Sequence, residues 1–308
     1  MKVLFVSSGK SGDVGHVVKN QGESLVRHGI EIEYLTIKSG LLEYLKAIPH
    51  INRRVRKGGY DLVHAHYSLS ALAATIAGCS PLVVSLMGSD AFHNSILRLI
   101  IRSLSKLKWA ATIVKTSEMK SRLKLNNALV IPNGADTDRF TPIEKDTARK
   151  YLGLPPDKRI ILFISVKNRP EKNFAMAKKA VESLHDASVE ILHLYDTPNS
   201  EIPYYLNAAD LLLLTSSREG SVNVIKEAMA CNCPIVSTDV GDVSWVMSGT
   251  EGCYISGHDH ESVTEKIKKA LAFGRRTNGR ERILEIGLDS ASVAKKIIDI
   301  YRAASQNV

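Results

Sequence analysis

The sequence has 308 residues, of which 44% are hydrophobic, 24% charged and 6% aromatic, and its formal net charge is +9. This composition excludes disordered, collagen-like and disulfide-rich chains, and the length suits two domains or one large one. No apolar run approaches the ~20 residues that span a bilayer, and the first apolar segment lacks the small-residue cleavage site of a signal peptide. We therefore expect an ordinary globular protein of the cytoplasm.

The positive charge is confined to one half of the chain. Residues 1–145 contain 20 lysines and arginines against 11 aspartates and glutamates, whereas residues 146–308 contain 21 of each. A one-sided excess points to an anionic surface or ligand that the N-terminal half meets.

Predicted strands and helices alternate along the chain. In the first half the strands are expected at 2–7, 30–35, 61–65 and 82–86, with a helix at 17–28. Turn residues then cluster between 132 and 156, and strands resume at 159–165, 189–194, 210–214, 234–237 and 252–255. This alternation is typical of parallel, doubly wound sheets. We predict an α/β protein with two Rossmann-like domains, 1–145 and 146–308, that face each other across a cleft; the last helix, 290–305, either caps the second domain or packs back on the first.

Three motifs that would indicate another class of protein fail on their spacing. Ser8-Gly9-Lys10-Ser11 lacks the glycine that a P-loop carries at position 4, and glycines at 9, 12 and 15 do not fit the dinucleotide fingerprint, which disfavours an NAD-linked enzyme. The cysteines lack zinc-site spacing and are interpreted as free thiols: Cys79, Cys231, Cys233 and Cys253.

The strongest pattern is Ser217-Arg-Glu-Gly-Ser-Val-Asn-Val-Ile-Lys-Glu-Ala-Met-Ala230. It follows an apolar strand and opens a helix, with Ser221 as the predicted N-cap. Gly220 and Ser221 would then present backbone N–H groups at a helix N-terminus, which is an anion site. Glu219 is expected in the loop and Glu227 two turns along the helix; the alternative is that both are solvated surface carboxylates.

These residues carry a family resemblance. The two glutamates, with seven residues between them and Pro234-Ile-Val-Ser-Thr-Asp-Val-Gly241 after them, resemble the donor-site signature of retaining GT-B glycosyltransferases of family 4. Other segments follow the family's order over nearly the whole chain: 61–66, 88–90, 130–136 with Phe140, 170–173 and 209–210. The resemblance implies the GT-B fold and a retaining, hexosyltransferase-like enzyme that moves a sugar from a nucleotide-diphosphate sugar to a hydroxyl acceptor.

The resemblance also assigns residues of the second domain to the donor. Glu227 is expected to accept hydrogen bonds from the ribose hydroxyls. Glu219 is expected to hold the sugar and the diphosphate, together with the donor-binding residues Gly220, Ser221 and Val222.

The family places an arginine and a lysine after the first strand of this domain, where they neutralise the leaving diphosphate. Lys172 matches the lysine, Lys167 stands at the arginine's place, and Arg169 lies close by as a substitute. With Glu219, these three are the predicted catalytic residues. Because basic residues occupy the phosphate position, we expect no metal and no cofactor besides the nucleotide sugar as co-substrate.

The acceptor is expected on the first domain. Backbone N–H groups of the glycine turn can approach an anion or a sugar, and histidine and aspartate follow later strands. The predicted acceptor and cleft residues are Gly12, Asp13, Gly15, His66 and Asp90. Met87 stands where many members have a histidine, and the segment between Tyr195 and Ile202 is short. These departures keep open a catalytically silent scaffold that binds sugar nucleotides.

A basic amphipathic stretch in the first domain suggests where the acceptor comes from. Its cations alternate with apolar residues between 96 and 109: Arg98, Arg102, Lys106 and Lys108. Such a stretch either lies on an anionic membrane or packs in the core with a solvated basic face. The first alternative implies a lipid-linked acceptor, peripheral attachment to the inner face of the cell membrane, and a role in surface polysaccharide or glycolipid biosynthesis; the second leaves a saccharide acceptor. No motif for binding nucleic acid is present.

Overall fold

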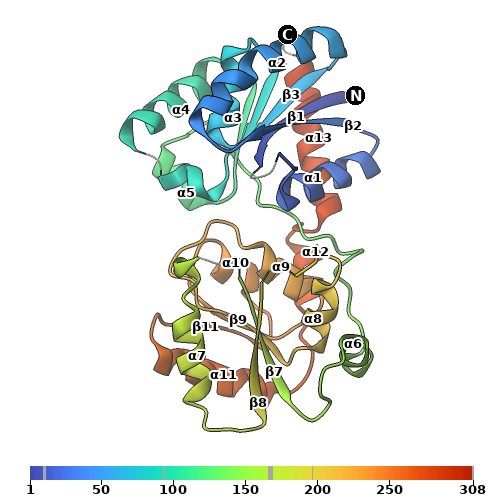
Figure 1. Cartoon of the computed structure of the whole chain (residues 1–308), viewed down its shortest axis with the longest axis vertical. Helices are drawn as coiled ribbons and strands as arrows, with labels where there is room; N and C mark the ends of the chain where they lie inside the picture. The colour runs from blue at the N-terminus through green and yellow to red at the C-terminus, as the bar shows by residue number, and fades with distance from the viewer. Residues whose placement is uncertain (10–11, 93, 166–168, 196, 307–308) are drawn as a thin grey trace. The chain divides into compact units, whose positions relative to one another are not determined.

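The computed structural model describes residues 1–9, 12–92, 94–165, 169–195 and 197–306. The chain divides into two compact units, Met1–Gly134 with Ser290–Val308 and Ala135–Asp289 (Figure 1). The second unit begins at Ala135, which is earlier in the chain than the boundary expected between residues 145 and 146. Residues 135–145 go with the second unit because Ala135 and Phe140 are buried in its core.

The first unit is built on a six-stranded sheet in the order β2-β1-β3-β4-β5-β6. All neighbouring strands are parallel. The strands are β1 (Lys2–Gly9), β2 (Glu31–Lys38), β3 (Leu62–His66), β4 (Leu82–Ser85), β5 (Ala111–Val114) and β6 (Leu129–Val130). Strands of such sheets are covered on both faces, which is why residues 3–6 of β1 and 82–84 of β4 are continuous apolar runs and all five residues of β3 are buried.

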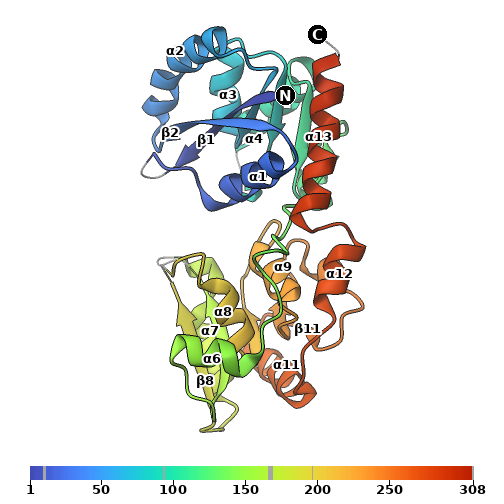
Figure 2. The ribbon, with the colours of Figure 1, turned by 90° about the vertical axis from the view of Figure 1, so that its right-hand side faces the viewer.

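Helices cover both faces of this sheet. One face carries α1 (His16–Arg27) and the last helix, α13 (Ser290–Gln306), whose Tyr301 is fully buried there. Figure 2 shows α13 running along the first unit. The other face carries α2 (Leu41–Gly58), α3 (Ser68–Ile76), α4 (Ser95–Leu107) and α5 (Ser117–Leu123), with the short 3-10 helix η1 (Gly88–Phe92) between β4 and α4. Of the two positions that the sequence left open for the last helix, the structure therefore shows the one on the first unit.

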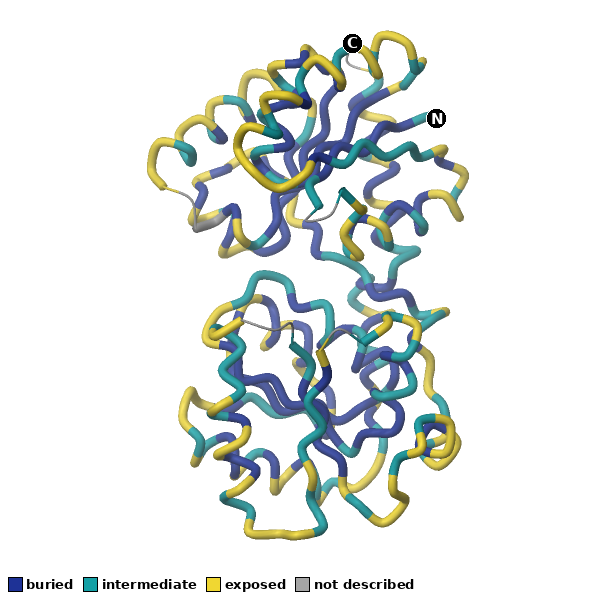
Figure 3. Tube along the Cα trace, in the orientation of Figure 1, coloured by how far each residue is buried: buried dark blue, intermediate teal, exposed yellow. Residues whose placement is uncertain are grey.

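The second unit is built on a five-stranded parallel sheet in the order β11-β10-β9-β7-β8. The strands are β7 (Arg159–Ile164), β8 (Val189–Leu194), β9 (Leu211–Leu214), β10 (Ile235–Thr238) and β11 (Cys253–Ser256). In Figure 3 the strands form the buried centre of each unit. The strand order reverses direction between β7 and β9, and ligands of open α/β sheets bind beside the carboxyl ends of the strands at such a point.

The helices of the second unit also lie on both faces. One face packs against α7 (Phe174–Glu182) and α11 (His260–Phe273). The other packs against α8 (Ile202–Ala208), α9 (Asn223–Ala230), α10 (Val243–Met247) and α12 (Gly279–Glu285), while α6 (Lys145–Leu152) and the 3-10 helix η2 (Pro170–Lys172) lie in connections. Over the described parts of the chain, no helix combines the length and the apolar character needed to cross a membrane.

Candidate active site

Three loops that follow adjacent strands meet at the carboxyl end of the second unit's sheet. They are the segment with η2 after β7, residues 215–222 after β9 and residues 239–242 after β10. Thr238 Oγ1 donates to the Ser216 carbonyl at 2.7 Å, and Thr215 Oγ1 donates to the carbonyls of Lys172 and Asn173 at 3.0 and 2.9 Å. These bonds join the three loops into one surface at the switch point of the sheet.

Two of the predicted catalytic residues meet on this surface. Lys172 Nζ lies 2.6 Å from Glu219 Oε1, and each side chain is 17% exposed. Ser216 Oγ donates to the same carboxylate oxygen at 2.9 Å. An ammonium group has three N–H donors, and for Lys172 only the contact to Glu219 occurs among the described residues. Lys172 can therefore still donate to a phosphate oxygen.

The other predicted cations are placed differently. Arg169 precedes η2, where it is about half exposed and forms an ion pair with Glu171. Lys167 lies outside the described residues. The structure therefore brings Lys172 and Glu219 together, and it places Arg169 at the start of the same turn.

The donor-site loop is held against the loop after β10. Gly241 has a φ of +60°, and a Cβ atom there would lie 1.8 Å from the Gly220 carbonyl oxygen, so only glycine allows this backbone contact. Ser221 Oγ donates to Asp242 Oδ2 at 2.7 Å, and the Val222 amide donates to Asp242 Oδ1 at 3.0 Å. The helix N-cap is Val222, so the prediction of Ser221 as the N-cap was wrong by one residue. The Ser221 hydroxyl donates its hydrogen bond to Asp242 and does not cap the helix.

A buried lysine completes this contact. The Lys226 side chain is 1% exposed; its Nζ lies 3.1 Å from Asp242 Oδ2 and also donates to Ser221 Oγ. Burial lowers the pKa of Lys226, and the carboxylate of Asp242 opposes that effect. Neither Lys226 nor Asp242 was predicted from the sequence. The available signals were a lysine inside an apolar helix and an aspartate just after the neighbouring strand.

Glu227 lies on α9 in a site that favours its neutral form. Burial raises its pKa to about 7, although Arg139 and Lys226 act in the opposite direction. Arg139 belongs to the turn at residues 137–140. Arg280 holds that turn, because its guanidinium donates to the carbonyls of Thr137 and Phe140, both at 2.9 Å. Arg139 is thus a cation near Glu227 that was missed, since 88 residues separate the two in the chain.

In the first unit, His66 is fully buried at the end of β3. Its ring stacks on that of His64 with centroids 4.3 Å apart, and neither ring nitrogen has a hydrogen-bond partner among the described residues. Burial, aided by the charge of Lys115, lowers the pKa of His66 to about 3. His66 is therefore a neutral imidazole enclosed in its unit.

Asp90 is buried as well, and its carboxylate binds the local backbone. The Met87 amide donates to Oδ2 at 2.6 Å, while the amide and hydroxyl of Ser68 donate to Oδ1 at 3.2 and 2.7 Å. Asp90 thus holds the start of α3 against the segment after β4.

The glycine turn after β1 requires its glycines. Gly12 has a φ of +92°, and a Cβ atom on Gly9 would lie 2.0 Å from the Asp13 carbonyl oxygen. Gly15 is the N-cap residue of α1. The predicted turn is therefore present in the described residues on either side of 10–11.

Helix α4 carries the predicted basic residues. Arg98, Arg102 and Lys106 lie within it, and Lys108 follows its last turn. The helix also presents apolar side chains to solvent: Ile96 is 72%, Leu99 59% and Leu107 72% exposed.

Two family models match consecutive parts of the chain. "Glycosyltransferase Family 4" matches residues 2–139, and "Glycosyl transferases group 1" matches residues 162–272. The chain belongs to the group 1 glycosyltransferases of family 4. The resemblance inferred from the sequence motifs is confirmed.

Curated relatives agree with this family. TuaC of Bacillus subtilis, named for teichuronic acid biosynthesis, is 30% identical over 240 residues, which cover 69% of this chain and 59% of TuaC. The D-inositol 3-phosphate glycosyltransferase of Mycolicibacterium smegmatis is 26% identical over 262 residues, which cover 70% of this chain and 60% of that protein. The chain therefore spans less than two thirds of the length of these two relatives.

Solved structures establish the fold. Sucrose-phosphate synthase from Thermosynechococcus elongatus aligns with a TM-score of 0.78 at 16% identity, over 99% of this chain and all of that one. HepE of Anabaena in complex with UDP aligns with a TM-score of 0.72 at 18% identity, over 97% of this chain and 99% of that one. With the two parallel sheets, these likenesses identify the GT-B fold, as predicted.

Proposed function

We propose that this chain transfers a sugar from a nucleotide-diphosphate sugar to a hydroxyl acceptor, with retention of the anomeric configuration. The observation that carries the proposal is the contact between Lys172 and Glu219 at the carboxyl ends of β7 and β9. A cation at this point suits a departing diphosphate. Membership of the family supports the reaction, and the HepE structures with UDP and with UDP-glucose make UDP-sugars the first donors to test.

Donor binding follows from the charges of this surface. In its charged form Glu227 accepts hydrogen bonds from the ribose hydroxyls, and nearby Arg139 favours that form. Glu219 and the backbone of residues 220–222 hold the sugar and the diphosphate. Asp242 keeps that loop in place through Ser221 and Val222.

The chemical step is mainly electrostatic. The bond between the anomeric carbon and the diphosphate oxygen breaks, and negative charge develops on the phosphate. Lys172 and Arg169, with Lys167, offset that charge without a metal ion. The acceptor oxygen forms its bond on the same face of the sugar, and its proton passes to the leaving phosphate oxygen. Nucleophilic catalysis by a side chain is then unnecessary, because positioning and charge lower the barrier.

The direct test is donor binding followed by donor hydrolysis. We expect one of the UDP-, GDP- or ADP-sugars to raise the melting temperature, since a ligand at 100 times its Kd adds ~2.7 kcal/mol of stability. We also expect slow hydrolysis of that donor, which Lys172→Ala lowers at least about tenfold, a loss of ~1.4 kcal/mol. Lys178→Ala is the matched control, because Lys178 pairs with Glu182 on α7 at an exposed position. A donor that binds without turnover would indicate the silent scaffold, and no binding at all would refute the proposal.

We further propose that the acceptor is lipid-linked and is met at an anionic membrane, in surface polysaccharide or glycolipid biosynthesis. On α4 the apolar side chains of Ile96, Leu99 and Leu107 are exposed beside exposed Lys106 and Lys108, although Ile101 on the opposite side is buried in the core. A helix that merely packed in the core would bury its apolar residues, whereas an interfacial helix exposes both kinds. Helix α2, on the same face of the sheet, adds exposed Leu41, Leu42 and Leu45. The name of TuaC supports a polysaccharide product.

A further inference from the structure

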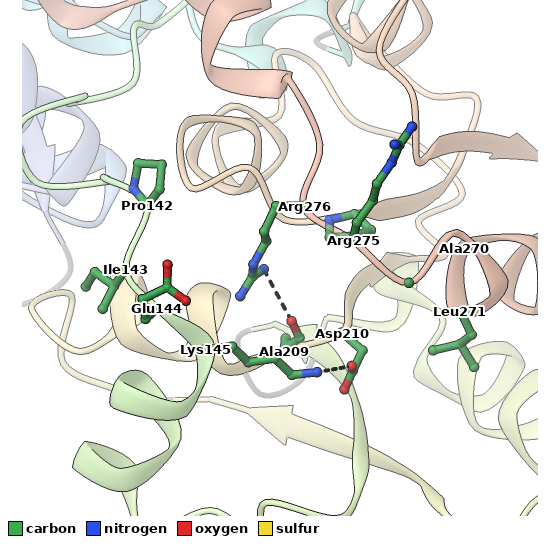
Figure 4. A pocket seen from close by; sticks show the side chains of 12 residues that line it. Pro142, Ile143, Glu144, Lys145, Ala209, Asp210, Ala270, Leu271, Arg275 and Arg276 are labelled. Atoms are coloured by element: carbon green, nitrogen blue, oxygen red, sulfur yellow. Dashed lines mark hydrogen bonds and ion pairs between the residues drawn. The ribbon is translucent and has the colours of Figure 1, made fainter.

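A cavity lies in the second unit, at the end of the sheet opposite to the candidate active site. Its volume is about 340 Å³, which falls in the range of small-ligand sites. Asp210 and Pro234, which line it, directly precede β9 and β10, so the cavity is at the amino ends of these strands. Figure 4 shows its lining residues. Nothing in the proposed transferase mechanism uses this cavity.

Arg276 brings a poorly compensated charge to the cavity wall. Its Nη1 donates to the carbonyls of Leu206 and Ala209 at the long distances of 3.3 and 3.4 Å. Its Nη2 is buried and has no hydrogen-bond partner, and no carboxylate lies within ion-pair distance of it, among the residues that the structure describes. A buried N–H donor without an acceptor costs free energy.

Two thiols close to Arg276 do not supply an opposite charge. They are the thiols of Cys231 and Cys233, both free and buried. Burial raises the pKa of Cys233 to about 11, and it raises the pKa of Cys231 as well. Both thiols are therefore neutral at ordinary pH, so neither of them is a counter-ion for Arg276.

A second cation stands across the cavity. Lys145 pairs with one carboxylate oxygen of Asp210. The other oxygen of Asp210 already accepts from Arg149 Nη2 at 2.9 Å and from the Ile160 amide at 2.6 Å. One carboxylate therefore serves two cations, and Lys145 keeps donors for an anion. In Figure 4 the head groups of Lys145 and Arg276 approach the same part of the cavity.

The other charged residues of the wall are Arg275 and Glu144. Arg275 forms an ion pair with Glu251 at 2.7 Å, and its side chain points away from Lys145 in Figure 4. Glu144 is the other lining carboxylate and is exposed. The rest of the wall is largely apolar: Pro142, Ile143, Ala209, Ala270 and Leu271.

We propose that this cavity binds a small organic phosphate monoester, whose phosphate oxygens accept hydrogen bonds from Arg276 and Lys145 while its apolar body lies against Ile143 and Leu271. Guanidinium and ammonium groups together are well suited to a phosphate group. The apolar wall distinguishes such a ligand from inorganic phosphate. The site is separate from the donor site and does not depend on the proposed transferase activity.

The test is calorimetric titration of the full chain with phenyl phosphate and with inorganic phosphate at low ionic strength. We expect one site for phenyl phosphate, with at least about tenfold weaker binding of inorganic phosphate. Arg276→Gln and Lys145→Gln should each weaken the binding of phenyl phosphate about tenfold or more. Arg275→Gln removes the same charge from the same wall and should leave the affinity unchanged. Unchanged melting temperatures establish that the variants fold. If Arg276→Gln does not fold, Lys145→Gln still tests the site.

Three results would overturn the site. Equal losses in Arg275→Gln and Arg276→Gln would show that the anion responds only to the general charge of this surface. Loss of binding in Lys172→Ala would assign the anion to the candidate active site. Absence of binding by the unaltered protein at millimolar phenyl phosphate would also refute the proposal.

Discussion

Replacement of Glu227 by glutamine tests the electrostatics of the candidate site through stability. Burial raises the pKa of Glu227 from 4.5 to about 7. Below pH 4.5 the carboxyl is neutral in both the folded and the unfolded chain, so it costs nothing. Above pH 7 it is charged in both, and the folded state bears the full cost of burying the charge. The free energy of unfolding therefore falls as the pH rises from 4.5 to 7, by about 3 kcal/mol at most, since one pKa unit is worth 1.36 kcal/mol.

Glu227→Gln removes this cost, because glutamine has nearly the same shape and carries no charge. We expect the variant to lie within about 1 kcal/mol of the original protein at pH 5 and to exceed its stability at pH 8 by up to about 3 kcal/mol. Urea unfolding at pH 5, 6, 7 and 8 measures the difference. Glu219→Gln is the control, because it breaks the contact with Lys172 and should give no such gain at pH 8. A difference that does not change with pH, or a variant that is less stable at pH 8, would refute the reasoning.

The remaining predictions concern binding and conditions. Glu227→Ala should weaken the binding of a nucleoside diphosphate by about 1.5–3 kcal/mol, as measured by calorimetry, because a charge-assisted hydrogen bond to the ribose is lost; unchanged affinity would remove Glu227 from the donor site. Activity should survive EDTA, and a complete loss restored by Mn²⁺ would contradict the metal-free step. Asp242→Ala should destabilise the chain by about 3–5 kcal/mol in denaturant unfolding, because it leaves Lys226 buried without a partner, and adding Lys226→Met should recover much of the loss. Co-sedimentation with anionic vesicles should fall with rising salt. It should vanish, while nucleotide binding persists, when four residues of helix α4 and its end are changed to glutamate: Arg98, Arg102, Lys106 and Lys108. If the protein does not bind such vesicles at low salt, it has no membrane-binding helix.

Most of the fold could be predicted because its signals are local. Continuous apolar runs predicted β1 and β4. Strands β5 (Ala111–Val114) and β6 (Leu129–Val130) were not predicted, since Thr112 interrupts the apolar run of the first and the second is an exposed pair without alternation. The place of α13 could not be predicted either, because an apolar stripe fits any apolar face. Only the packing of Tyr301 and its neighbours against the first sheet decides it.

In the candidate site too, local motifs could be predicted from the sequence and contacts between distant segments could not. Glu219 and Glu227 were predicted from one short family motif and Lys172 from another, but the 2.6 Å contact between Lys172 and Glu219 joins residues 47 positions apart. Nothing in either segment alone indicates that contact. His66 is the opposite case. A histidine at the end of a strand suggests a ligand-binding side chain, and its enclosure between Phe5 and His64 depends on the neighbouring strand and on its own.

The buried pair of Lys226 and Asp242 explains why charged residues were the hardest to place. A lysine is almost never fully buried unless it is paired, so position 226 alone indicates a solvated side chain on the outer face of α9. The partner comes from the loop after the adjacent strand, where Gly241 lets the two backbones touch. Burial, partner and backbone contact depend on one another, and each arises only once β9 and β10 are side by side. The role of a charged residue that holds a loop can therefore be recognised from the folded structure but not from the sequence alone.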